Sequence, residues 1–193
     1  MTVREQVLEF HQVFDQPVLE KPSVPDDERV RLRARLITEE FRETLQSLFD
    51  GESTWDHQRH IAKEHWQHAR AHIEAIINFA KVKVDVVELA DGLADLDYVV
   101  EGTRLEFGID GGPVADEVHR SNMAKAPPCP DCDGRGEVRA QLGDGYNFDV
   151  INCPTCHGLG RIVRRREDGK ILKPDSWTAP DIAGVLRKQG WRE

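Results

Sequence analysis

The sequence predicts an all-α fold, a helical bundle, with a small β-hairpin insertion near the carboxyl end. Apolar residues recur at helical spacing through most of residues 1–126. All four cysteines fall between 129 and 156, in an eight-residue pattern that occurs twice, CPDCDGRG and CPTCHGLG. At 193 residues, with 39% hydrophobic and 32% charged residues, the chain can bury a core, so one domain plus a small module is expected.

Five helices are expected before the cysteines, because apolar residues in each recur every three or four positions. Prolines followed by acids mark the start of the second, and glycines with a proline separate the fourth from the fifth. The fourth is expected to be mostly buried, since Val, Leu and Ala dominate it. The expected ranges are 3–15, 26–49, 54–80, 82–107 and 113–125. Helices of this kind pack most simply as an antiparallel bundle.

The repeated C-x-x-C-x-G-x-G pattern indicates a zinc site. Each C-x-x-C places two thiolates on a tight turn, and the glycines let backbone amides approach the sulfurs. EVRAQL and NFDVI alternate as two strands joined by GDG. Four thiolates close a tetrahedral site without an open position for water, which is typical of structural zinc. The expected ligands are Cys129, Cys132, Cys153 and Cys156.

The expected division is a helical domain at 1–126, a zinc-binding insertion at 127–167, and a loop with a short helix at 168–193 that packs back on the first. A net charge of −9 at pH 7 argues against a general nucleic-acid binder. The sequence MTVREQVLEFHQVF lacks an apolar signal segment, and charges interrupt every apolar run before a membrane-spanning length. A cytoplasmic protein with reduced thiols is expected, which favours zinc over disulfides.

Two sets of acidic residues are spaced so that each set can face one side of a helix. The sets are Glu39, Glu40 and Glu43, and then Glu88, Asp91 and Asp95. No Lys or Arg interrupts the second set, and carboxylates are rarely buried unless they are paired. The first set alone is better explained as a solvated helix face. Together they favour a hard divalent cation such as Mg²⁺ or Mn²⁺.

EEFRE followed by ELADGLAD resembles the E-E-x-x-E … E-x-x-D signature of the all-α NTP pyrophosphohydrolases. The closer similarity is to MazG-like and phosphoribosyl-ATP-pyrophosphohydrolase-like members, over FHQVFDQPV, RLRARLITEEFRE, VELADGLADLDYVVEGTRLEFGI, EVHRSNMAK and REDGKILKPDSWTAPDIAGVL. The resemblance implies that 1–126 is a catalytic domain for Mg²⁺-dependent (or Mn²⁺-dependent) hydrolysis of a (deoxy)nucleoside triphosphate to the monophosphate and pyrophosphate. Phosphoribosyl-ATP is an alternative substrate.

The resemblance also implies roles for individual residues. The implied metal ligands are Glu40, Glu43, Glu88 and Asp91. Glu39 would orient the attacking water or hold a second ion, and Asp95 would assist either role or contact substrate. Asn122 and Lys125 would contact the nucleotide, with Arg120 and His119 as weaker candidates. Relatives build the site within dimers or dimers of dimers, so a homodimer or homotetramer is implied.

The sequence departs from the family pattern at two insertions. Residues 44–87 are more than compact members place between the two acid sets, and the surplus could reshape the base pocket. Its histidines, at 57, 60, 65, 68 and 72, are expected on a solvated helix. The cysteine octets resemble those of DnaJ-type co-chaperones, but the chain lacks the H-P-D motif, so chaperone function is not implied.

A cluster of arginines follows the second octet, at Arg161, Arg164, Arg165 and Arg166. These side chains could reach a polyphosphate or a nucleic-acid strand, although an exposed basic strand needs no ligand and is favoured. The alternative to an enzyme is a non-catalytic helical scaffold that presents the zinc ribbon to a protein or nucleic-acid partner. Trp177 could stack on a base, but an isolated Trp in a tail is more often a packing anchor.

Overall fold

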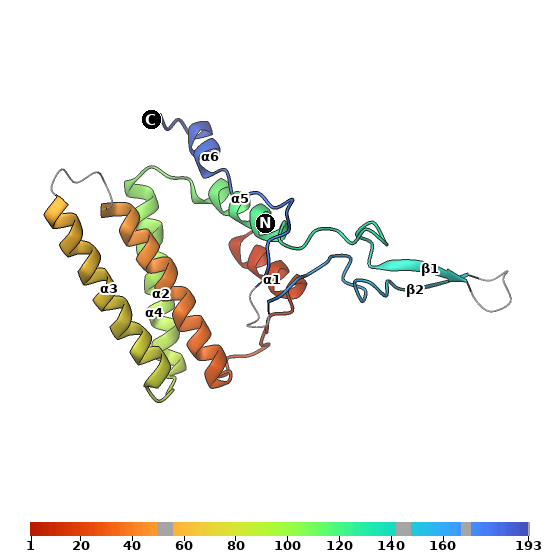
Figure 1. Cartoon of the computed structure of the whole chain (residues 1–193), viewed down its shortest axis with the longest axis horizontal. Coiled ribbons are helices and arrows are strands. Elements are labelled where there is room, and N and C mark those ends of the chain that lie inside the picture. The colour runs from red at the N-terminus through yellow and green to blue at the C-terminus, as the bar shows by residue number, and fades with distance from the viewer. Residues whose placement is uncertain (50–55, 142–147, 167–170, 193) are drawn as a thin grey trace. The chain divides into compact units, whose positions relative to one another are not determined.

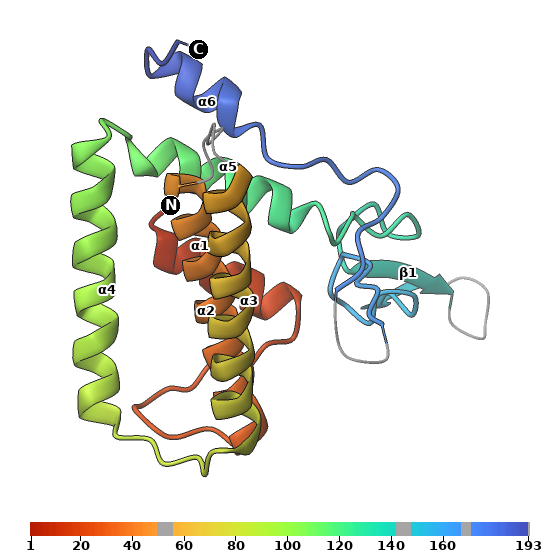
Figure 2. The same cartoon turned by 60° about the vertical axis from the view of Figure 1, so that its left-hand side comes forward.

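The computed structural model describes residues 1–49, 56–141, 148–166 and 171–192, without the side chains of residues 46, 49, 56–66 and 141. The predicted all-α fold with one small hairpin is confirmed (Figures 1 and 2). The helices are α1 (Val3–Val13), α2 (Asp27–Phe49), α3 (Asp56–Phe79), α4 (Val86–Glu106), α5 (Gly111–Met123) and α6 (Ile182–Lys188), and the strands are β1 (Glu137–Gln141) and β2 (Phe148–Asn152).

α2 begins within one residue of its predicted start, and α3 is described from residue 56 on. The starts of α4 and α5 differ by two residues or more from the sequence prediction, and an aspartate explains each. α4 begins at Val86 rather than Val82, because the Asp85 carboxylate accepts hydrogen bonds from the amides of Val87 at 3.0 Å and Glu88 at 3.3 Å. α5 begins at Gly111 rather than Pro113, because Asp110 is its N-cap and accepts from the Gly112 amide at 3.0 Å. The short side chain of an aspartate, which accepts hydrogen bonds from backbone amides, therefore sets the start of both helices.

The chain forms two compact units, residues 21–94 and residues 1–20 with 95–193. In the first unit α2 and α3 lie antiparallel, because the start of α2 meets the end of α3. The Arg31 guanidinium donates to the Ile77 carbonyl and, at 2.9 Å, to the Ala80 carbonyl. These bonds satisfy carbonyls that the end of α3 leaves without helical partners. Arg35 adds a 2.6 Å bond to the Asn78 side chain.

In the second unit α1 and α6 both pack against α5. Between α1 and α5, the buried Gln6 donates to Asp116 at 2.5 Å. Between α5 and α6, the side chain of Gln189 exchanges two hydrogen bonds with the backbone of Asp110, at 2.9 and 3.0 Å. The fully buried Phe14 and Ala126 form a small core with Met123. The boundaries predicted at 126/127 and 167/168 remain predictions.

The expectation that the fourth helix is mostly buried is wrong for a single chain. The structure describes α4 throughout, and none of its residues is buried. Leu89, Leu93, Leu96 and Val100 are 43–49% exposed. An apolar helix is buried only where another apolar surface covers it, and within each unit the described residues leave α4 exposed or half-exposed. Among the described residues no helix is both long and apolar enough to cross a membrane.

Candidate functional site

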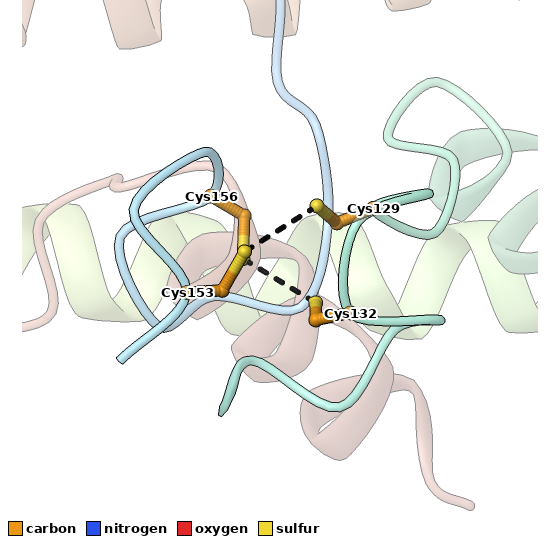
Figure 3. A group of neighbouring side chains, drawn as sticks. All are labelled: Cys129, Cys132, Cys153 and Cys156. Atoms are coloured by element: carbon orange, nitrogen blue, oxygen red, sulfur yellow. Dashed lines mark hydrogen bonds between the residues drawn. The ribbon is translucent and has the colours of Figure 1, made fainter. Parts of the chain in front are cut away.

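The four cysteines converge on one point, as the octet pattern predicts. All four are buried, and their sulfur atoms lie within 4.8 Å of one another (Figure 3). The Cys129 and Cys153 sulfurs are 3.8 Å apart, and those of Cys132 and Cys156 are 3.7 Å apart. A disulfide needs about 2.05 Å between sulfurs, so these are four free thiols arranged around a common centre. The group can bind a metal ion.

The two octets adopt the same backbone conformation. Their fifth residues, Asp133 and His157, have φ of 49° and 52°, and the glycines at their sixth and eighth positions also have positive φ. The amides of Gly136 and Gly160 each donate to the last cysteine sulfur of their own octet at 3.3 Å. The loops also touch: a Cβ on Gly136 would lie 2.4 Å from the Gly158 carbonyl oxygen. Only glycine fits there.

The environment of the thiols differs from one sulfur to the next. Burial raises the pKa of the Cys129 thiol to about 12. Hydrogen bonds from backbone amides, chiefly that of Cys156, lower the pKa of Cys153 to about 7. A cation among the sulfurs would favour the thiolate form of all four, because a metal ligand thiol is deprotonated.

The arginines that follow the module have structural partners within the chain. Arg161 donates to the Ala126 carbonyl at 2.9 Å, just beyond α5. Arg165 donates to the carbonyl of Phe14 at the end of α1. Arg164 and Arg166 are exposed. Two of the four arginines thus hold the base of the module against helix ends, a role that the sequence pattern did not indicate.

The structure places both predicted sets of carboxylates on exposed helix surfaces. Glu39, Glu40 and Glu43 lie on α2, and Glu88, Asp91 and Asp95 lie on α4. The Glu43 carboxylate forms an ion pair with the guanidinium of its neighbour Arg42, with 3.1 Å between oxygen and nitrogen. Among the described residues of a single chain, the cysteines are the one group of His, Cys, Asp or Glu close enough to share an ion. The carboxylates are therefore not gathered within one chain.

The predicted substrate contacts lie at the carboxyl end of α5. Lys125 donates to the Asn122 side chain at 2.7 Å, and both residues are half-buried. Arg120 makes two hydrogen bonds to Glu117, at 2.7 and 2.8 Å. Those bonds, with the amide of Asp181, hold the pKa of the Glu117 carboxyl at about 2, well below its usual range. Arg120 is therefore already engaged in an ion pair with Glu117.

Trp177 anchors the carboxyl-terminal tail to α5, which was the favoured interpretation of this residue. Its indole donates to the Ser121 carbonyl at 2.8 Å, and the buried Ser121 hydroxyl donates to the Thr178 carbonyl at 3.0 Å. Lys173 lies over the indole, 3.6 Å from the ring centre. In the histidine segment, His68 and His72 are exposed, and the side chains of His57, His60 and His65 lie outside the described residues.

The structure contains a groove between α2 and α3 that no sequence motif predicted. Its volume is about 170 Å³. It joins residues of α2 and α3 that are 27 to 42 positions apart, so only the pairing of the two helices reveals it. The groove has an apolar floor and a charged rim. Its lining residues are Arg35, Thr38, Glu39, Phe41, Arg42, Ala69, Arg70, Ile73, Glu74 and Ile77.

Comparisons with known proteins give a family match over residues 7–122 and a structural match over nearly the whole chain. The sequence model of phosphoribosyl-ATP pyrophosphohydrolase (PRA-PH) matches residues 7–122. The crystal structure of a candidate NTP pyrophosphohydrolase from Exiguobacterium sp. 255-15 aligns over 98% of this chain and 97% of that one, with a TM-score of 0.61 and 22% identity. At that identity the match establishes the fold.

A third comparison concerns a short segment. A 36-residue stretch is 50% identical to chaperone protein DnaJ 2 of Aromatoleum aromaticum and covers 19% of this chain and 9% of that protein. The chain therefore spans a small part of that relative. With the four-cysteine cluster, this match supports the predicted resemblance of the module to DnaJ-type repeats.

Proposed function

Since the chain belongs to the phosphoribosyl-ATP pyrophosphohydrolase family and is therefore a nucleotide pyrophosphohydrolase, we propose that it converts a (deoxy)nucleoside triphosphate and water to the monophosphate and pyrophosphate. One observation carries the proposal: both acid sets are complete and exposed on α2 and α4. The family description favours phosphoribosyl-ATP as a second candidate substrate. Because the family assignment makes the chain a hydrolase of phosphoanhydride bonds, it argues against the alternative of a non-catalytic helical scaffold.

In this proposal the catalytic ion is Mg²⁺ or Mn²⁺, held by Glu40, Glu43, Glu88 and Asp91. Carboxylate oxygens are the ligands that these hard cations prefer, so the donor set fits. When bound, the ions would neutralise phosphate oxygens and lower the pKa of a bound water. Glu39, one position before the ligand pair, would orient the attacking water as a hydrogen-bond acceptor. Asp95, one turn beyond Asp91, would support either function.

Lys125 is the proposed phosphate contact, as a point charge, and Asn122 holds its ammonium group at 2.7 Å. Arg120 is the weaker candidate, because its pairing with Glu117 would have to be broken before it could bind substrate.

The metal proposed for the cysteine module is zinc. A tetrahedral zinc–thiolate site with bonds of about 2.3 Å separates its sulfurs by about 3.8 Å. The measured separations of 3.7 and 3.8 Å fit that geometry. With four thiolates there is no open position for water, so the ion would be structural. Free thiols of this kind persist in a reducing compartment, and a cytoplasmic location is part of the proposal.

A second copy of this chain is the proposed cover for α4, in a homodimer or homotetramer. Leu89, Leu93, Leu96 and Val100 are separated by steps of four, three and four, so they form one stripe along the helix. All are more than 40% exposed in a single chain. A stripe of this kind is typical of a helix packed against another helix.

Replacing Leu93 by Glu is expected to weaken self-association by about 100-fold or more, because a carboxylate would be buried without a partner. Analytical ultracentrifugation over a concentration series measures this. Glu101→Gln is the matched control, since Glu101 is an exposed residue of α4 that already pairs with Arg104. A wild-type protein that sediments as a monomer at every concentration contradicts the assembly.

The activity is tested with purified protein, Mg²⁺ or Mn²⁺, and a panel of NTPs, dNTPs, diphosphates and phosphoribosyl-ATP. We expect the monophosphate and pyrophosphate from at least one triphosphate, and loss of that turnover in excess EDTA. Separate assays for pyrophosphate and phosphate distinguish this cleavage from release of a terminal phosphate. Absence of turnover across the panel, or turnover that survives EDTA, would contradict the proposal.

A further inference from the structure

We propose that the groove between α2 and α3 is the subsite that receives the nucleobase of the substrate, an inference that rests on the proposed function. Its large apolar lining residues are Phe41, Ile73 and Ile77, which are called its floor below. Phe41 is 55% exposed, so its ring is available for stacking, whereas Ile77 is 8% exposed and closes the bottom. Aromatic faces stack on bases of any kind, and aliphatic side chains cover the opposite face.

The rim offers the polar groups that a base edge requires. Thr38 already donates its hydroxyl to the Ala34 carbonyl at 2.8 Å, which leaves oxygen lone pairs to accept a bond. Arg70 and Arg42 add donors. An apolar pocket with a few polar groups at its margin is the common form of a small-molecule site.

The size of the groove indicates which part of a nucleotide it takes. A volume of about 170 Å³ is below the roughly 300–1,000 Å³ that encloses a drug-sized ligand. A nucleoside triphosphate would therefore place only one part of itself in the groove. The uncharged, planar base suits an apolar floor, whereas the triphosphate would lose its hydration there.

The position of the groove relative to the acid set supports the same orientation. Glu39 lines the groove, and Glu43 lies one helical turn further along α2, a rise of about 6 Å. Arg42 spans the two, because it lines the groove and pairs with Glu43 at 3.1 Å. A base in the groove would therefore direct the sugar and phosphates toward Glu40 and Glu43. Ala69, Arg70 and Ile73 come from the segment that separates this chain from compact relatives, so that segment would set base preference.

The test fills the groove. Ile73→Trp places a large ring on its floor, and Ile76→Trp is the matched control, since Ile76 is 64% exposed on the same helix and does not line the groove. Calorimetry with Mg²⁺ measures the Kd of a nucleoside triphosphate and of inorganic tripolyphosphate, which has no base. We expect Ile73→Trp to raise the Kd of the nucleotide by about 10- to 100-fold and to leave that of tripolyphosphate within about twofold.

Other outcomes overturn the inference. Equal losses for both ligands, or no loss for either, exclude a base subsite. A change in sedimentation with Ile73→Trp but not Ile76→Trp would instead mean that a second copy covers the groove. Phe41→Leu is the second variant, since it removes the stacking ring while keeping an apolar side chain, should Ile73→Trp fail to fold. If the wild type binds nucleotide but hydrolyses none, the proposed function fails while the groove is still tested by binding.

Discussion

Replacing Glu43 by Gln is expected to lower kcat by about 100- to 1,000-fold on whichever triphosphate the enzyme hydrolyses. The change keeps the size of the side chain and removes its negative charge, so a proposed metal ligand is lost without a cavity. Loss of one strong electrostatic contact to the reacting groups costs about 3–4 kcal/mol of barrier, and each 1.36 kcal/mol is tenfold in rate. Steady-state kinetics at saturating Mg²⁺ measures the change.

The control for Glu43→Gln is Glu101→Gln, which neutralises an exposed carboxylate on α4 that pairs with Arg104 at 3.0 Å. Helical periodicity places Glu101 on the side of α4 opposite Glu88. Its kcat is expected to stay within about twofold of wild type, because exposed ion pairs contribute little. Substantial turnover by Glu43→Gln would remove Glu43 from the ligand set, whatever the identity of the substrate.

Replacing Cys153 by Ser is expected to reduce the zinc content from one ion per chain to nearly none. Serine keeps the size of the side chain but is not a thiolate donor, and the closed site needs all four. Structural zinc contributes about 10–16 kcal/mol in small zinc domains, so the hairpin should lose its order with the ion. Elemental analysis gives the stoichiometry, and hydrogen exchange reports β1 and β2.

Thr155→Ser provides the control in the same loop. The Thr155 hydroxyl donates to Asp131 at 2.5 Å, and a serine hydroxyl at this position would keep that bond. The zinc content of this variant should therefore remain at one ion per chain. The far-ultraviolet dichroism of both variants should resemble wild type, because most helices lie before residue 127. Wild-type protein purified without chelators that contains well below one zinc per chain would contradict the zinc proposal.

Patterns in the local sequence predicted the features that are determined by residues close together along the chain. Helical spacing located α1 to α5, and the octets located the four thiols, because each is a repeat of short period. Exact helix starts were missed where a single acceptor decides them, as Asp85 and Asp110 do. The sequence offers several residues that could each cap the helix, so it does not show which of them marks the start.

Features that depend on residues far apart in the sequence were harder to predict from the sequence. The sequence favoured an exposed basic strand for Arg161 and Arg165, whereas in the structure they donate to the carbonyls of Ala126 and Phe14. The apolar character of α4 predicted a buried helix, but composition does not say whether the covering surface comes from the same chain. Its exposure in one chain is what turns that composition into a proposal of self-association.

The module enters and leaves the helical part at a single place. The Ile162 amide donates to the Pro127 carbonyl at 2.9 Å, Pro128 and Arg161 form a bridge, and Arg161 reaches Ala126. Because the two ends meet, a short turn could join Ala126 to Val163 without moving either. Insertions whose ends are adjacent are the kind that a host fold tolerates. The hairpin that holds the four cysteines therefore has the attachment geometry of an insertion that can be removed while its two attachment points stay in place.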